Sequence, residues 1–309
     1  MNYLVTGGAG FIGSHVAESL AERGDGLVRV LDNLRTGRHD NLDGLDVEFV
    51  EGSVTDEDVL CRSLRNVDAV FHLAAMVSVP ETMEHPLECM EINALGTIQL
   101  LAAARRQGVR HVVLSSTSAI YGDHPAQPKE ESMCPQPLSP YAVSKLNAEM
   151  SMQILGEPWG IHTTSLRYFN VFGPRQDPGS AYAAAIPIFL SRALRDEDIV
   201  IFGDGEQTRD FVYVKDVVQA NLLALESGDG IYNVGSGGTI SVNELARKII
   251  SMTGSKSRIV HADPRPGDVR HSGADIGRIR KIGFAPRVEC EQALEWTVQH
   301  LRRRLSGEG

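Results

Sequence analysis

The sequence predicts an α/β protein whose parallel sheet is covered by helices on both faces. Short apolar runs alternate with helical patterns through the first half of the chain, an order typical of such sheets. A glycine-rich stretch separates the first apolar run from the first helical pattern, and small or polar residues follow several later runs. Ligands of doubly wound sheets bind beyond the carboxyl ends of the strands, so these features also predict where the functional site lies.

Six apolar runs are expected to form the strands of this sheet, and a seventh strand returns to it later. The runs lie at 2–6, 27–31, 47–50, 68–73, 111–114 and 163–166, and the returning strand at 231–234. Helical patterns lie between them, at 11–20, 56–64, 86–107 and 141–155. Gly108 is expected to end the third of these helices.

The composition is that of a soluble globular enzyme, and it argues against several kinds of partner. A formal charge of −10 disfavours nucleic acid, because phosphate binding needs a basic surface. No apolar run approaches the ~20 residues of a membrane helix, and the first strand leaves no room for a signal peptide. Four scattered cysteines without metal-ligand spacing predict no metal site. We therefore expect a cytoplasmic protein that binds neither membrane nor nucleic acid.

The glycine-rich stretch has the spacing and context of a dinucleotide-binding loop. Gly7, Gly10 and Gly13 lie between a strand and a helix that opens with Phe11 and Ile12. They are expected to allow a tight turn, close approach to a pyrophosphate, and close packing of helix on strand. The helix N-terminus offers free N–H groups to the phosphates. This predicts a Rossmann-like fold.

Asp32 indicates which dinucleotide is bound. It ends the second predicted strand, nineteen residues after Gly13. A carboxylate at this place accepts hydrogen bonds from the adenosine ribose hydroxyls and repels a 2′-phosphate. NAD is therefore expected rather than NADP.

Tyr141 and Lys145 lie four residues apart on one face of a predicted helix that begins at Ser139-Pro140. Tyrosine loses its proton near pH ~10, so its use as a base at pH 7 needs a downward shift of about 3 pKa units. The Lys145 ammonium is expected to supply part of this shift, and a cationic nicotinamide more. The alternative is an ordinary surface pair, since the YxxxK spacing is common.

The composition of the sequence changes at Asn170, where glycine, proline and polar residues replace the regular alternation of apolar runs and helical patterns. We predict an NAD-binding domain over 1–169, to which a segment at about 210–238 returns. A smaller α/β domain is expected over 170–309, with a helix whose capping box is Ser241 and Glu244.

Six motifs in order resemble those of the extended short-chain dehydrogenases/reductases, and in particular the nucleotide-sugar 4-epimerases. They are TGGAGFIG at the start, SSTSAIYG at 115–122, YAVSK at 141–145, RYFNVFGPRQDP at 167–178, GDGEQTRDFVYVKD at 203–216 and RPGDVRHS at 265–272. The resemblance runs over essentially the full length. It implies a C-terminal domain that binds a UDP-sugar, and a homodimer paired through the helices at 86–107 and 141–155.

The resemblance also assigns roles to residues. Thr117 takes the Ser/Thr position, Tyr141 that of the base, and Lys145 that of its partner and of a nicotinamide-ribose ligand. The expected cofactor contacts are Gly7, Gly10, Phe11, Ile12, Gly13, Asp32, Asn33, Ala74, Ala75, Asn93, Tyr141, Lys145 and Tyr168. The expected substrate contacts are Ser78, Thr117, Tyr141, Asn170, Arg209, Arg265, Asp268 and Ser272.

The implied reaction is NAD-dependent 4-epimerisation of a UDP-hexose through a 4-keto intermediate. Ser118 and Ala119 stand where dehydratase and decarboxylase relatives carry acids, which favours plain epimerisation. Ser272 is small, as in relatives that accept 2-acetamido sugars, so UDP-GlcNAc and UDP-GalNAc are expected beside UDP-Glc and UDP-Gal. UDP-glucuronate or a UDP-pentose is the alternative substrate, and a non-catalytic NAD- and nucleotide-sugar-binding protein is the alternative class. Ser53, Val77 and Glu81 depart from the family pattern.

Overall fold

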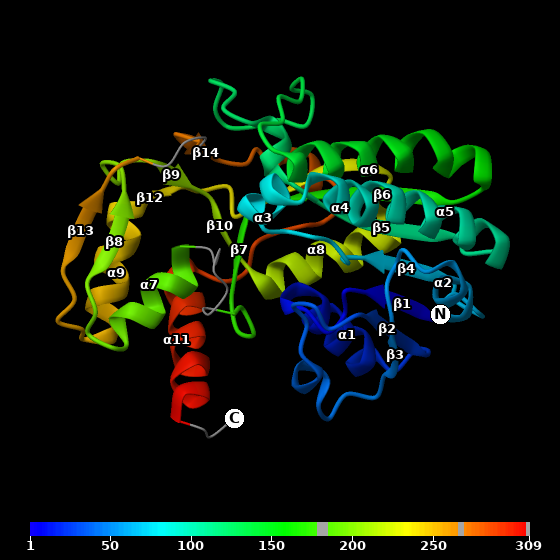
Figure 1. Cartoon of the computed structure of the whole chain (residues 1–309), viewed down its shortest axis with the longest axis horizontal. Helices are drawn as coiled ribbons and strands as arrows, with labels where there is room; N and C mark the ends of the chain where they lie inside the picture. Colours follow the sequence, from blue (N-terminus) through cyan, green and yellow to red (C-terminus); the bar gives the residue numbers. More distant parts are fainter. Residues whose placement is uncertain (178–184, 265–268, 307–309) are drawn as a thin grey trace.

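The computed structural model describes residues 1–177, 185–264 and 269–306 (Figure 1). Seven parallel strands form one sheet in the order β11-β6-β5-β4-β1-β2-β3. They are β1 Tyr3–Thr6, β2 Val28–Asp32, β3 Glu48–Glu51, β4 Ala69–His72, β5 His111–Thr117, β6 His162–Tyr168 and β11 Gly230–Val234. The order reverses between β1 and β4, which creates a switch point at their carboxyl ends. The predicted doubly wound α/β fold is confirmed.

Helices cover both faces of this sheet, each over its own apolar core. Strand side chains alternate between the faces, so Val5 packs under one set of helices and Leu4 under the other. The first face carries α1 Phe11–Arg23 and α8 Val214–Ser227. The second carries α2 Glu57–Ser63, α5 Gly96–Gln107 and α6 Pro140–Gly156. In Figure 1, α5 and α6 lie beside β5 and β6 in the upper part of the view, and α1 lies beside β1 and β2 in the lower part.

The single helix predicted over 86–107 is divided into three parts. Helix α3 Val79–Glu84 precedes it, and α4 Pro86–Cys89 leads into a π-helical turn, Met90–Leu95, before α5 begins. This wider turn carries Asn93, whose side chain is hydrogen-bonded to both backbone groups of Met76. The predicted helix over 86–107 and its end at Gly108 are thus confirmed, and the π-helical turn in its middle is a local feature that the helical pattern does not reveal.

The second half of the chain adds three small sheets and a third apolar core. Strand β7 Asn170–Phe172 pairs with β10 Phe211–Tyr213, and β8 Ile199–Phe202 with β13 Ile259–Ala262. The third sheet has the order β12-β9-β14, formed by Ile240–Ser241, Thr208–Arg209 and His271–Ser272. Helices α7 Ala185–Ala193, α9 Val242–Thr253 and α11 Cys290–Ser306 enclose the core, and α10 is Gly277–Arg280.

The predicted N-cap of α9 is present, since the Ser241 hydroxyl accepts from the Glu244 N–H at 3.1 Å, which is one of the two bonds of a capping box. Strand β11 pairs with β6 at the edge of the large sheet, so the chain returns there after β10. Within the described ranges, no helix combines the length and apolar character needed to cross a bilayer.

Candidate active site at the carboxyl edge of the large sheet

Thr117, Tyr141 and Lys145 come together where α6 lies over the carboxyl end of β5. Thr117 is the last residue of β5, and its side chain is hydrogen-bonded to that of Tyr141. Lys145 is 2% exposed, and its Nζ donates to the Ser115 carbonyl at 2.8 Å. Helix α6 begins as predicted, with the Ser139 hydroxyl accepting from the N–H of Ala142. These contacts place both α6 side chains beside one strand end.

The net pKa shift of Tyr141 runs opposite to the predicted direction. Burial raises the pKa of Tyr141 to about 12, although the hydrogen bond from Thr117 opposes this. Burial also lowers the pKa of Lys145 to about 8. The protein alone therefore favours the neutral tyrosine, because desolvation outweighs the polar contacts. A phenolate requires a further positive charge close to the Tyr141 oxygen.

Behind the pair lies a polar cluster that the sequence reasoning did not find. The Asn93 amide donates to the Ser144 hydroxyl at 2.9 Å, and Ser144 donates to the Tyr141 carbonyl at 2.8 Å. Asn93 also bonds both backbone groups of Met76, at 2.8 and 3.0 Å. Its amide is thereby committed to the loop after β4 and to α6, so Asn93 positions these segments. The weak S–H group of Cys89 completes the cluster.

The glycine loop has the shape that a dinucleotide requires. Gly7 has φ +67°, and a Cβ on it would lie 2.7 Å from the Ala74 nitrogen. A Cβ on Gly13 would lie 2.1 Å from the Gly7 carbonyl oxygen, so this position must also be glycine. Around Gly10 the one contact within 4 Å is the same carbonyl at 3.1 Å, which leaves its outer side open. Gly10 caps α1 without a side-chain bond, so the helix N-terminus is accessible to phosphate.

Asp32 lies beside this loop at the end of β2. Its carboxylate accepts from the backbone N–H groups of Ala9 at 2.9 Å and Leu34 at 2.8 Å. Burial raises its pKa, and these backbone bonds oppose the rise. Each carboxylate oxygen retains acceptor capacity for a ribose hydroxyl. Asn33 is exposed, and its side chain accepts from the N–H of Arg35.

The other expected cofactor residues lie around the same edge. Phe11 and Ile12 occupy the first turn of α1, and Ala74 and Ala75 follow β4. The Tyr168 hydroxyl donates to Asn221 on α8 at 3.0 Å. The proton of the Tyr168 hydroxyl is therefore donated to another residue of the protein.

Three expected substrate residues gather around Asp210. Arg209 and Ser272 are register partners on β9 and β14, and the Asp210 N–H donates to the Ser272 carbonyl at 2.8 Å. The Asn170 side chain donates to the Asp210 carbonyl at 3.1 Å. Ser78 instead caps α3 by accepting from the N–H of Glu81. The predicted contacts Arg265 and Asp268 lie outside the described residues.

Asp210 itself was not predicted, although it organises these strands. Its fully buried carboxylate accepts from the N–H groups of Ser236 at 2.7 Å, Gly237 at 3.0 Å and Ala274 at 3.3 Å. Burial raises its pKa, and these hydrogen bonds oppose the rise. The carboxylate thereby ties β9 to the segments that precede β12 and follow β14.

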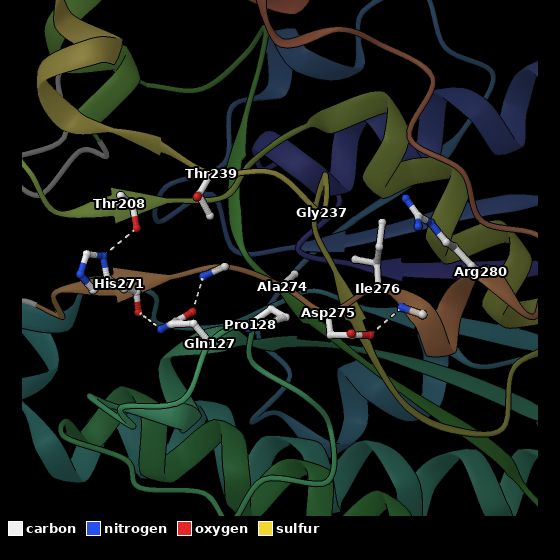
Figure 2. A pocket seen from close by; sticks show the side chains of 12 residues that line it. Gln127, Pro128, Thr208, Gly237, Thr239, His271, Ala274, Asp275, Ile276 and Arg280 are labelled. Atoms are coloured by element: carbon white, nitrogen blue, oxygen red, sulfur yellow. Dashed lines mark hydrogen bonds between the residues drawn. The ribbon is translucent and has the colours of Figure 1, made fainter.

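A groove of about 600 Å³ lies near this small sheet but does not include the Tyr141–Lys145 pair. Figure 2 shows Thr208 and His271 directed toward each other at one end of it and Arg280 at the other. Because side chains alternate along a strand, Arg209 and Ser272 project to the opposite face of the sheet. None of the predicted site residues lines the groove, which is therefore distinct from the candidate active site.

Comparison with known families identifies the fold and the cofactor class. A model described as the NAD dependent epimerase/dehydratase family matches residues 3–235. The chain belongs to this family. NAD is accordingly the cofactor of the family, in agreement with the prediction from Asp32 and the glycine loop.

Among solved structures, a UDP-glucose 4-epimerase from Thermotoga maritima with UDP-glucose superposes with a TM-score of 0.95. It is 43% identical, and the match covers 99% of this chain and 100% of that one. A UDP-N-acetylglucosamine 4-epimerase from Methanobrevibacter ruminantium, in complex with UDP-N-acetylmuramic acid, has a TM-score of 0.94 and 40% identity over 98% of both chains. A UDP-N-acetyl-alpha-D-glucosaminuronate decarboxylase from Bacillus cytotoxicus is 35% identical over 97% of each chain. The family members thus differ in chemistry.

The structure places the three residues that depart from the family pattern, Ser53, Val77 and Glu81, in different surroundings. Val77 is 57% exposed, and the Ser53 hydroxyl is bonded to that of Thr55 at 2.8 Å. Glu81 pairs with Arg35 at 2.8 Å. The contact between Glu81 and Arg35 joins α3 to the segment that follows β2, and both border the expected cofactor site.

Proposed function

We propose that the protein catalyses NAD-dependent 4-epimerisation of a UDP-hexose through a 4-keto intermediate. Its substrates are UDP-Glc and UDP-Gal and also UDP-GlcNAc and UDP-GalNAc. The observation that carries the proposal is the assembly of Thr117, Tyr141 and Lys145 beside a glycine loop shaped for a dinucleotide. The two solved 4-epimerases named above support it, because they match nearly the whole chain.

The chain supplies the proton transfers of this reaction. NAD held at the glycine loop and Asp32 would supply the hydride acceptor and donor for C4, with the 4-keto sugar turning over between the two transfers so that its other face is reduced. Tyr141 removes the proton of the 4-hydroxyl as C4 is oxidised, and gives it back to the ketone oxygen as C4 is reduced. Thr117 orients that oxygen by a hydrogen bond, and Lys145 bonds the nicotinamide ribose. The proton and the hydride are both returned, so no net oxidation results.

The pKa shifts explain why the cofactor's charge matters for this mechanism. A Tyr141 pKa near 12 leaves very little phenolate at neutral pH. A positive charge within a few ångströms favours the phenolate and lowers this pKa. The same buried setting strengthens every such interaction, because the local dielectric is low. A positively charged cofactor close to Tyr141 would therefore increase the fraction of Tyr141 that is deprotonated and able to act as a base.

The substrate side favours a UDP-sugar with an unmodified C5–C6 unit. Arg209 presents a planar donor group suited to a diphosphate, and Asn170 lies on the adjoining strand. Arg265 and Asp268 are expected from the family motif to complete the nucleotide contacts. Ser118 and Ala119 follow Thr117 where a dehydratase or decarboxylase needs an acid. Ser272 is half-buried on β14, and its small side chain supports acceptance of an acetamido group.

We further propose that two copies pair through the helices on the second face of the sheet. Large apolar side chains are exposed there on α4, the π-helical turn and α6, among them Leu87 at 85% and Ile154 at 64%. Leu95, Val143 and Met150 extend the same surface. A monomer rarely leaves such a patch in water, and pairing would bury it. Sedimentation of wild type as a dimer and of Ile154→Glu as a monomer is the expected result.

The decisive experiment is a panel of UDP-sugars incubated with the purified protein and followed by proton NMR. We expect the 4-epimers of UDP-Glc and UDP-GlcNAc to form without accumulation of absorbance at 340 nm. Turnover of UDP-glucuronate or a UDP-pentose alone would reassign the substrate. Loss of carbon dioxide would reassign the reaction, and no turnover of any sugar would indicate a binding protein.

A further inference from the structure

Arg35 makes two ion pairs that the proposed reaction does not use. Its guanidinium donates to Glu88 at 2.5 Å and to Glu81 at 2.8 Å. The three side chains are between 31% and 42% exposed. The bond to Glu88 raises the pKa of Arg35, and Arg35 in turn lowers the pKa of Glu88. One arginine is thereby shared between two carboxylates from a distant part of the chain.

The pairs join segments on either side of the glycine loop. Arg35 follows β2, whereas Glu81 and Glu88 lie on α3 and α4, which follow β4. Strand β1 lies between β2 and β4, and Gly7 begins the loop at its carboxyl end. All three strands are parallel, so their carboxyl ends share one edge. The ion pairs therefore connect the two banks of the dinucleotide groove.

The local backbone holds Arg35 rigidly on its bank. Leu34 has a φ of +56°, unusual for a residue other than glycine, and its N–H is bonded to the Asp32 carboxylate at 2.8 Å. The N–H of Arg35 donates to the Asn33 side chain at 3.2 Å. The carboxylate expected to bind the adenosine ribose thus also fixes the turn that carries Arg35.

An arginine at this place has an alternative partner. Arginine near the second strand accommodates the 2′-phosphate of NADP in dinucleotide-binding folds. Arg35 lies three residues after Asp32, and a phosphate dianion would compete well for its guanidinium. In this protein both terminal nitrogens are occupied by Glu81 and Glu88.

We propose that Arg35, Glu81 and Glu88 form an ion-pair clamp that retains NAD and withholds Arg35 from the 2′-phosphate of NADP. The proposal rests on the cofactor role given above. Glu81, which departs from the family pattern, then has a function in cofactor selection. Asp32 repels the 2′-phosphate, and the clamp occupies a cation three residues away that would attract it.

The test measures NAD release and NADP affinity in variants of the full-length protein. The double variant Glu81→Gln with Glu88→Gln keeps the side-chain shapes and frees Arg35. We expect it to release NAD about two- to tenfold faster and to shift the NADP-to-NAD affinity ratio about tenfold toward NADP. Arg35→Gln should release NAD equally fast but gain no NADP affinity. Release is followed after dilution of the loaded protein, and NADP affinity by calorimetry.

A matched control is the ion pair between Arg106 and Glu57, which is 2.7 Å long and lies between α2 and α5. Glu57→Gln should change neither quantity. Raised salt should speed NAD release from wild type and leave Arg35→Gln unaffected. Unchanged release and unchanged NADP affinity in the double variant would overturn the clamp. Wild type that binds no NAD at all would instead overturn the cofactor role itself.

Discussion

The cofactor side and the substrate side of the site are built in different ways. On the cofactor side Asp32, Thr117 and Lys145 are at most 9% exposed, on long strands or helices with apolar cores on both faces. On the substrate side Asn170, Arg209 and Ser272 are half-buried on strands of two or three residues. The first set is fixed by the main fold, and the second depends on a few local bonds.

This difference separates the chemistry from the choice of sugar. Changing a buried residue of the large sheet disturbs the packing of its neighbours, so the proton-transfer group tolerates little variation. Side chains on short strands change with less effect on the core. The relatives named above include 4-epimerases of two different UDP-sugars and a decarboxylase.

The largest effect is expected from removing the base on the cofactor side. Tyr141→Phe should lower the epimerisation rate by about 10²- to 10⁴-fold, the usual contribution of a positioned general base. Epimer formation is measured by NMR, and bound NAD by its release on denaturation. Tyr232→Phe is the control, since the Tyr232 hydroxyl lies on β11 and donates to the Asp229 carbonyl. A Tyr141→Phe variant as active as wild type would refute the mechanism.

On the substrate side, Arg209→Gln should weaken substrate binding and leave chemistry nearly unchanged. The lost charged hydrogen bonds are each worth about 1.5–3 kcal/mol, so kcat/KM should fall about 10- to 100-fold, mainly through KM. The control Arg258→Gln removes an arginine that is 81% exposed and paired with Asp198. A fall in kcat with an unchanged KM would place Arg209 outside the substrate site.

Lys145→Met should stabilise the protein while it lowers activity. The folded-state pKa of Lys145 is about 8, against an ordinary value of 10.5, so the buried charge costs stability. Below pH 8 this cost is complete, and it is relieved as the pH rises from 8 to 10.5 because the folded state loses its proton first. We expect a gain of about 1–3 kcal/mol at pH 7. It should shrink by pH 10.5 in thermal unfolding, whereas a pH-independent difference would contradict this origin.

The smallest effect concerns selectivity between sugars. Ser272→Tyr should lower kcat/KM for UDP-GlcNAc about tenfold relative to UDP-Glc, because the larger side chain takes the space of the acetamido group. The ratio is measured with both substrates in one reaction. Ser272→Thr serves as the control of similar size. Equal losses for both substrates would show that position 272 does not select the sugar.

Much of the fold was predictable because its signals are local. The alternation of apolar runs, the glycine spacing from Gly7 to Gly13 and the proline after Ser139 each act within a few residues. The π-helical turn inside the helix at 86–107 was not predictable. This turn contains Asn93, which contacts Met76, seventeen residues earlier, through hydrogen bonds that leave no periodic trace.

The same distinction applies to the site. Thr117, Tyr141 and Lys145 could be named as candidates from motifs, whereas only the register of β9 with β14 shows that Arg209 and Ser272 are neighbours. Asp210 and Ser144 were missed because their partners lie far along the chain. The sign of the Tyr141 shift was also missed, since the pKa depends on how deeply the fold buries the hydroxyl.

The amino-acid sequence by itself determined the doubly wound fold and the glycine loop, and it named Thr117, Tyr141 and Lys145 as the candidate catalytic set. Only the tertiary structure decided that Arg35 is paired with Glu81 and Glu88 and that burial raises the Tyr141 pKa. The Arg35 ion pairs and the Tyr141 pKa share one physical reason. Hydrogen bonds, ion pairs and desolvation depend on distances between residues that are remote in sequence, and those distances exist only in the folded chain.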